Sequence, residues 1–238
     1  MPEVIELGEL SAEVVRKPIR HVHLSVYPPA GRVRISAPEQ MDLDTIRVFI
    51  ISKLGWIRSQ QRKMQMQARE LPREYLQRES HFVWGKRYLL QLVEKDAPPL
   101  VALKHKSLVL QLRPGAGAGQ CAELLESWYR EQLKAAVPAL IAKWEPLLGV
   151  KVARFYVQRM KTRWGSCNPL RQTIRLNTDL AKKPPEALEY VVVHEMTHLL
   201  EPTHNARFTG LLDIHLPGWR HLRNELNILP VRHEEWAG

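Results

Sequence analysis

The sequence predicts an α+β fold in which a β-rich amino-terminal half packs on a second half that carries a metal motif on a central helix. Three observations predict it: early segments of alternating apolar residues, later stretches of helical periodicity, and the pattern His194-Glu-Met-Thr-His198. The 238 residues are enough for one or two domains. The stretch Pro114–Gly119 is rich in glycine and lacks apolar periodicity. We therefore expect residues 1–115 to form a β-rich region with one long helix, and residues 120–238 to form the catalytic domain.

The first half begins with a hairpin followed by a helix. Segments His21–Val26 and Arg32–Ala37 alternate between apolar and polar side chains, and the residues between them favour a turn. Asp42 or Asp44 can cap a helix that runs to about Arg69, because apolar residues then recur at helical spacing.

The rest of the chain alternates between strands and helices. Residues 81–112 show strand patterns, and helical periodicity runs from Cys121 to about Leu148. Two further strands are expected at Val150–Gln158 and Thr173–Asn177, and the second is a candidate edge strand that pairs with an extended peptide. A proline pair at residues 184–185 suits the first turn of a helix. This order of strands and helix is the context that a zinc-hydrolase motif requires.

The helix opened by these prolines carries the metal motif. His194 and His198 are four residues apart, so their imidazoles lie on one helix face and can bind one Zn²⁺ ion. Glu195 lies beside the first ligand, where its carboxylate can take a proton from a metal-bound water without binding the metal. A lone H-E-x-x-H pattern also arises by chance, but here it follows a Val-Val-Val run that anchors one helix face in the core.

A third metal ligand is needed, and two residues are candidates. His204 follows His198 after five intervening residues, and Glu201-Pro202 between them should end the helix and turn the chain back. Glu201 is the alternative ligand, because a downstream carboxylate can complete such a site. We favour His204, since three histidines at this spacing are otherwise hard to explain. Zn²⁺ is the expected ion, with Mn²⁺, Ni²⁺ or Mg²⁺ as alternatives.

The composition is that of a soluble globular protein, with 45% hydrophobic and 25% charged residues. No apolar run approaches the roughly 20 residues that span a bilayer, and the acidic amino terminus is unlike a secretory signal. With only two cysteines, far apart, a cytoplasmic location without membrane association is expected. The formal charge of +10 attracts polyanions such as nucleic acid weakly, although basic residues spread along the whole chain also describe an ordinary solvated surface.

Several segments resemble the YgjP-like group of bacterial metallohydrolases, relatives of the SprT-like and WLM zinc proteases. The resemblance spans most of the chain beyond roughly the first 20 residues, and it implies a minigluzincin-like catalytic half with three metal ligands. Members of the group are described as metallopeptidases, and a nucleoside-triphosphate pyrophosphatase activity has also been associated with it. The segments that carry the resemblance are the metal motif with His204 and Asn205-Ala-Arg-Phe208, Lys161-Thr-Arg-Trp-Gly-Ser-Cys167, Ser36-Ala-Pro38, Trp56-Ile57 and Trp84-Gly-Lys-Arg-Tyr88.

The basic segment before the metal helix offers residues for a second role. We expect Arg163 to be catalytic, because with Lys161 and Arg159 it can stabilise a developing oxyanion or hold a phosphate. Trp164 suits a core position equally well, and Cys167 suits a small buried side chain better than a ligand. Other candidates for the oxyanion partner, among which the sequence does not choose, are Tyr156, His215 and His221.

These residues lead to one expected function and two alternatives. A zinc-dependent metallopeptidase acting on polypeptides is favoured, with water activated by Glu195. The first alternative is a nucleoside-triphosphate pyrophosphatase that uses the same metal centre and holds the nucleotide with Arg and Lys. The second is a nucleic-acid-associated module with a structural metal, which three ligands and a neighbouring glutamate argue against.

Overall fold

The computed structural model describes residues 3–27, 31–66, 74–160 and 163–228, and these form two compact units. Within the described residues, the first unit ends at Met66 and the second runs from residue 74 to Ile228. The stretch Pro114–Gly119, where the sequence predicts a boundary, lies inside the second unit, because the strand before it and the helix after it share one core. No helix in the described ranges is long and apolar enough to cross a membrane.

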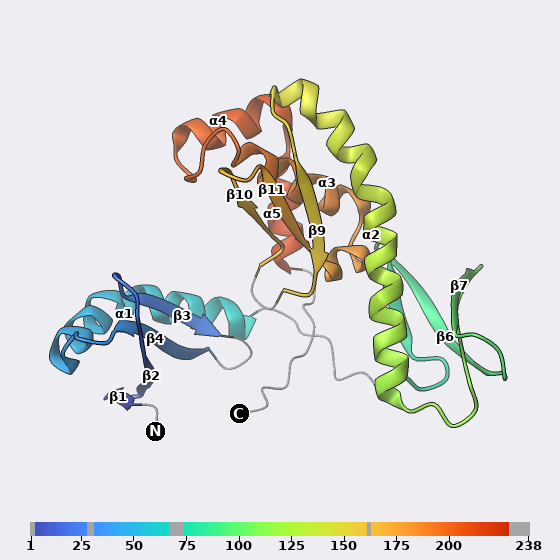
Figure 1. Ribbon diagram of the computed structural model, residues 1–238, viewed down its shortest axis with the longest axis horizontal. Coiled ribbons are helices and arrows are strands. Elements are labelled where there is room, and N and C mark those ends of the chain that lie inside the picture. The colour runs from blue at the N-terminus through green and yellow to red at the C-terminus, as the bar shows by residue number, and fades with distance from the viewer. Residues whose placement is uncertain (1–2, 28–30, 67–73, 161–162, 229–238) are drawn as a thin grey trace. The chain divides into compact units, whose positions relative to one another are not determined.

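The first unit is a four-stranded sheet with one helix packed on it (Figure 1). The predicted hairpin and the capped helix are both confirmed, and the Thr45 amide donates to Asp42 Oδ1 over 2.7 Å. Helix residues Ile46, Ile50 and Ile57 are buried with sheet residues. Two strands ahead of the hairpin were not predicted. In sheet order the strands are β1 (Glu3–Leu7), β2 (Leu10–Lys17), β4 (Arg32–Pro38) and β3 (His23–Tyr27), and the helix is α1 (Leu43–Met66).

The second unit begins with another four-stranded sheet, which shares its core with the long helix α2 (Ala118–Leu148). The turn of its first hairpin is fixed to the segment that precedes the metal helix. Gly85 has a φ of +75°, and a Cβ there would lie 2.9 Å from Pro184 Cγ. The Trp84 amide donates to the Ala181 carbonyl over 2.8 Å. In sheet order the strands are β5 (Ser80–Val83), β6 (Lys86–Glu94), β8 (Ser107–Leu112) and β7 (Leu100–Lys104).

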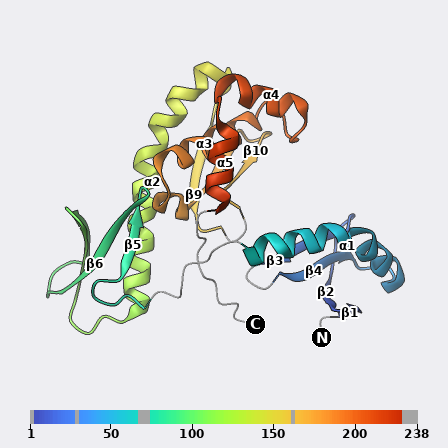
Figure 2. The ribbon, with the colours of Figure 1, turned by 180° about the vertical axis from the view of Figure 1, so that it is seen from behind.

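A three-stranded sheet and three α-helices complete the second unit. The sheet order is β10-β11-β9, with β11 parallel to β9 and antiparallel to β10. Helices α3 and α5 lie on one face of this sheet, as the two opposite views show (Figures 1 and 2). The elements are β9 (Arg154–Gln158), β10 (Gly165–Asn168), β11 (Thr173–Asn177), the 3₁₀ helix η1 (Thr178–Lys182), α3 (Pro185–Thr197), α4 (Ala206–His215) and α5 (Trp219–Ile228).

The position of Thr173–Asn177 corrects one prediction. This strand was the candidate edge strand, but it lies in the centre of the sheet as β11. The two edges are formed by β9 and β10, and all four residues of β10, Gly165–Asn168, pair with β11. Only four residues long and led by glycine, β10 has too little apolar alternation to be recognised as a strand from its sequence.

Candidate metal centre

Helix α3 presents two histidines at its carboxyl end. Pro185 occupies the first turn, and the buried run Val191–Val193 fixes one face of the helix in the core. The helix ends at Thr197, so His194 lies in its last turn and His198 caps it. The two imidazole rings are therefore on the same face, with their centroids 5.0 Å apart.

The chain then turns back and brings His204 to the same place. The Nε2 atoms of His204 and His194 are 3.0 Å apart, and one ligand atom from each of the three histidines lies within 4.8 Å of the others. In the part of the chain that the structure describes, this is the one cluster of three or more side chains with this geometry. The sequence-predicted triad is thus brought together.

Glu201, the alternative ligand, has a different role. Its carboxylate accepts hydrogen bonds from the Thr203 hydroxyl over 2.8 Å and from the Thr203 amide over 3.3 Å. These bonds lower the pKa of Glu201. Its backbone carbonyl lies 3.0 Å from His198 Nδ1, so that nitrogen can donate to it and leave Nε2 as the ligand atom. Glu201 thus shapes the turn and orients His198 while its carboxylate stays outside the cluster.

The triad has the chemistry of a divalent-metal site. Two nitrogens bound to one tetrahedral Zn²⁺ at about 2.0–2.1 Å lie roughly 3.3 Å apart, close to the 3.0 Å between His194 and His204 Nε2. Burial, followed by the neighbouring His198, His204 and Arg223, lowers the pKa of His194 to about 3. Burial also lowers the pKa of His204, with His198 and Arg223 adding to the shift. Both imidazoles are therefore held neutral, which is the form that binds metals.

Phe208 forms the apolar support of the triad. Its ring centroid is 4.9 Å from that of His194, 4.6 Å from that of His198 and 4.8 Å from that of His204. The Phe208 amide donates to the side chain of Asn205, which caps α4, over 3.0 Å. The cap therefore fixes the ring that all three imidazoles pack against.

Glu195 is buried beside the triad and in contact with β10. A Cβ on Gly165 would lie only 2.6 Å from Glu195 Oε1, so the carboxylate packs directly on this strand. Burial raises the pKa of Glu195 to about 8, although the charge of Arg163 acts in the opposite direction. Burial and the charge of Glu195 raise the pKa of the nearby Cys167 thiol to about 12. Cys167 is therefore protonated at neutral pH, and it does not belong to the metal-ligand cluster.

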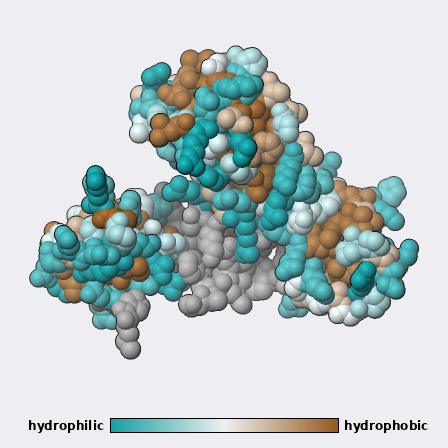
Figure 3. Space-filling view, viewed as in Figure 1, coloured by the Kyte–Doolittle hydropathy of each residue, from teal (hydrophilic) through white to brown (hydrophobic). Residues whose placement is uncertain are grey.

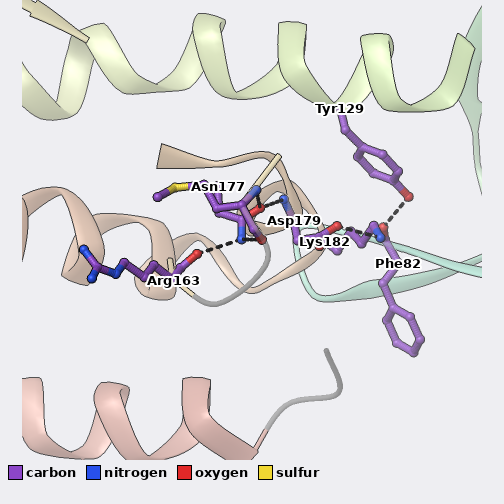
Figure 4. Close-up of polar contacts among 7 residues, drawn as sticks. Phe82, Tyr129, Arg163, Asn177, Asp179 and Lys182 are labelled. Carbon is purple, nitrogen blue, oxygen red and sulfur yellow. Dashed lines mark hydrogen bonds and ion pairs between the residues drawn. The ribbon is translucent and has the colours of Figure 1, made fainter. Parts of the chain in front are cut away.

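Asn177 connects β11 to the segment that carries Arg163 (Figure 4). Its Nδ2 atom donates to the backbone carbonyls of Met160 and Arg163, each over 2.8 Å. Its Oδ1 atom accepts from the amide of Asp179 over 3.2 Å. The backbone on both sides of residues 161–162 is thus held by one buried side chain. Lys161 itself lies outside the described residues.

The candidates for an oxyanion partner are placed differently. Tyr156 pairs with Arg175 in the sheet register, on the face away from Glu195. His221 lies 3.2 Å from Glu225 on the surface of α5. Arg163 is exposed, and its charge reaches Glu195. For His215, the remaining candidate, the structure gives a position at the end of α4.

Arg223 was not identified from the sequence. Its charge lowers the pKa of His194 and His204 and acts on Tyr190, whose pKa burial raises to about 12. Tyr190 packs on His194 and stacks on Trp219, which lies one helical turn before Arg223 in α5. Only the packing of α5 against α3 reveals this neighbourhood, because no local motif surrounds Arg223.

Comparison with known proteins gives a family match and partial structural matches, among them those with two metallopeptidase zymogens. The sequence profile of the family described as YgjP-like, metallopeptidase domain, matches residues 20–228. A comparison with curated proteins finds no significant match. The crystal structure of the metallopeptidase zymogen abylysin of Pyrococcus abyssi is 20% identical, with a TM-score of 0.36, over 38% of this chain and 90% of that chain. The crystal structure of the metallopeptidase zymogen jannalysin of Methanocaldococcus jannaschii is 18% identical, with a TM-score of 0.35. This match covers 38% of this chain and 92% of that chain.

Proposed function

The chain belongs to the YgjP-like metallopeptidase family, and from this premise we propose that it is a zinc-dependent peptidase with His194, His198 and His204 as metal ligands. The convergence of three imidazoles within 4.8 Å of one another, beside a buried carboxyl group, carries the proposal. Three ligands leave one position of a tetrahedral ion open, as catalytic zinc sites require. When bound, the ion supplies a Lewis acid that polarises the scissile carbonyl and acidifies water. We assign this half a minigluzincin-like arrangement with the metal motif on α3.

Glu195 is the general base of the proposed reaction. Its carboxylate takes a proton from the attacking water and delivers it to the nitrogen of the scissile peptide bond as that bond breaks. A pKa of about 8 allows the same group to accept and return the proton near neutral pH. Arg163, which Asn177 holds by its backbone, is assigned to stabilise negative charge that develops on the carbonyl oxygen.

The open edge of β10 is the proposed binding site for the substrate main chain. Among the described strands only β11 pairs with β10, so the opposite edge has no partner strand there. The Asn177 amide donates to the Trp164 carbonyl over 2.9 Å, which makes residues 164 and 177 a hydrogen-bonded pair. Because such pairs alternate in antiparallel sheets, the main-chain groups of Gly165 and Cys167 point to the open edge. An extended peptide that pairs there passes directly beside Glu195.

Metal content and turnover of the purified protein test the proposal. Wild type is expected to bind about one Zn²⁺ per chain and to cleave an unfolded protein. Glu195→Gln should retain the metal and lose about 10²- to 10⁴-fold in kcat, the usual contribution of a general base. His204→Ala should lose the metal. Glu186→Gln, a matched control in the exposed first turn of α3, should leave both unchanged. A wild type that neither retains nor responds to Zn²⁺, Mn²⁺ or Ni²⁺ would show that the proposal is wrong.

Main-chain pairing along β10 has its own test. A series of peptide substrates, each N-methylated at one position, removes one amide donor at a time. If the peptide pairs with Gly165 and Cys167, KM should rise at alternate positions only, because alternate residues of a strand face its partner. Equal effects at neighbouring positions would contradict pairing at this edge.

The same assays also test the two alternative functions, for which we expect negative results. No observation on the described residues favours a nucleotide substrate or a purely structural metal. We expect no release of pyrophosphate from a panel of nucleoside triphosphates with Mg²⁺ or Mn²⁺. Release that depends on Glu195 would transfer the function to nucleotides. Weak attraction to nucleic acid and a cytoplasmic location stay predictions.

A further inference from the structure

The face of the β9–β10–β11 sheet that is turned away from α3 has no role in the proposed reaction. Gly165 and Cys167 face Glu195, so the residues that alternate with them face the other way. In the strand register, Ser166, Arg175 and Tyr156 form one row across this second face. Figures 1 and 2 show α3 and α5 on the opposite side, and Figure 3 shows hydrophilic residues over part of these strands, with hydrophobic residues beside them. This face is therefore a separate surface.

The segment that builds this sheet carries a large excess of positive charge. Residues 149–183 contain nine Lys or Arg and one acidic residue, which is a net charge of 9 − 1 = +8. The net charge of the whole chain is +10. The acidic residue, Asp179, is buried and paired with Lys182 over 2.8 Å. Within the described ranges, no ion pair involves Arg154, Arg171 or Arg175. Three arginines are thus available to an external anion.

An aromatic ring lies among these arginines. The side chain of Tyr156 is 39% exposed, and the Arg175 guanidinium carbon lies 5.4 Å from its ring centroid. Arg154 is exposed in the next row of the sheet, and Arg171 is exposed in the β10–β11 turn. A tyrosine and a guanidinium placed together on a sheet form a stacking platform for an unpaired base. An acidic polypeptide would use the charge but would have no use for the ring.

We propose that the sheet face defined by Arg154, Tyr156 and Arg175, together with Arg171 in the adjoining turn, binds single-stranded nucleic acid. The arginines contact phosphates, and a base stacks on the Tyr156–Arg175 pair. A single strand is required because the bases of a duplex are already stacked and cannot reach a ring that lies on a sheet. The inference does not rest on the peptidase function, since this face lies across the sheet from Glu195.

Fluorescence anisotropy with the full chain tests the inference. The probes are labelled 20-nucleotide strands, oligo(dT) and oligo(rU), titrated at about 50 to 200 mM salt, where phosphate contacts are most visible. Tyr156→Leu should weaken binding about 5- to 150-fold, which is the range for one stacked base. Arg175→Gln should also reduce the slope of log affinity on log salt by about 0.7. Arg220→Gln is the matched control, because this exposed arginine of α5 is paired with Asp213 of α4.

The results of these titrations distinguish single-stranded nucleic acid from an acidic polypeptide as the partner of this face. Binding of either probe that is weakened by Tyr156→Leu and spared by Arg220→Gln supports the inference, and the stronger probe shows whether DNA or RNA is preferred. Absence of binding at about 50 mM salt overturns it, since phosphate contacts are strongest there. Equal competition by a poly-glutamate peptide, with no effect of Tyr156→Leu, also overturns it and assigns the face to acidic polypeptides. The double variant Arg154→Gln/Arg171→Gln repeats the test without changing the ring.

Discussion

Gly165→Ala probes the contact between β10 and Glu195 with a single methyl group. The new Cβ would lie 2.6 Å from Glu195 Oε1, 2.7 Å from Cγ and 2.9 Å from Cδ. Non-bonded carbon atoms are normally about 3.5 Å or more apart, so one of the two groups must move by nearly 1 Å. The backbone of Gly165 does not require glycine, because it is not among the positions with positive φ. The substitution therefore acts on Glu195 and not on the strand conformation.

The expected size of the effect follows from that displacement. Inserting a methyl group into a packed site costs typically 1–3 kcal/mol of unfolding free energy. A catalytic group displaced by about 1 Å can lose about 10²-fold in rate. We therefore expect kcat to fall about 10²-fold while zinc content is unchanged, since the three atoms nearest to the new Cβ all belong to Glu195 and none to a metal ligand.

Urea unfolding and peptidase assays measure the two effects separately. Gly210→Ala is the matched control, because a Cβ at this helical glycine meets nothing within 4 Å. In a Glu195→Ala background the carboxylate is absent, so Gly165→Ala should cost little stability, and the double-mutant cycle should give a coupling above about 1 kcal/mol. A coupling near zero, or a loss of metal in parallel with activity, would refute the contact-based reasoning.

Three further predictions concern other parts of the second unit. Asn177→Asp should destabilise it by about 2–4 kcal/mol, because two carbonyls lose their donor; the exposed Asn224→Asp, a control for the added charge, should not shift the urea midpoint. Phe208→Leu should weaken Zn²⁺ binding at least tenfold in a chelator competition with little change in the fold, whereas Leu212→Met on the same helix should not. Glu189 is partly buried, which raises its pKa, but hydrogen bonds from Lys143 and Trp144 lower it overall, below the ordinary value of 4.5. The contribution of the ionised Glu189 carboxylate to the free energy of unfolding is therefore present above pH 4.5, and it is lost as the pH falls through the lowered pKa. Glu189→Gln should accordingly flatten the decline of the unfolding free energy in acid.

Features set by local chemistry were predicted from the sequence. The hairpin of β3 and β4, the Asp42 cap and the start of α3 each depend on residues a few positions apart. The meeting of the three histidines was also predicted, because a helix fixes the first two and the Glu201-Pro202 turn returns the third. The family resemblance is confirmed by the match over residues 20–228.

The boundary predicted at Pro114–Gly119 shows where local reasoning ends. A run of glycines indicates chain flexibility, but flexibility does not decide whether the flanking elements share a core. Here Leu110 of β8 and Leu125 of α2 are buried in the same hydrophobic cluster, which places the glycine-rich stretch inside one unit. The division of the chain depends on this long-range packing, which composition does not encode.

The short strand β10 explains why an edge of the sheet was predicted at the wrong strand. Its four residues, Gly-Ser-Cys-Asn, bury no large side chain, so nothing in their pattern marks a strand. These residues form a strand because of two neighbours. β11 supplies the hydrogen bonds, and Glu195 leaves no room for a side chain at Gly165. The apolar pattern marked β11 more clearly as a strand, and the edge was therefore predicted there. However, β11 has buried residues along its length, which is typical of a strand inside a sheet. A strand that must present its main chain to a ligand beside a buried carboxylate needs small residues, and small residues are the ones that periodicity cannot detect.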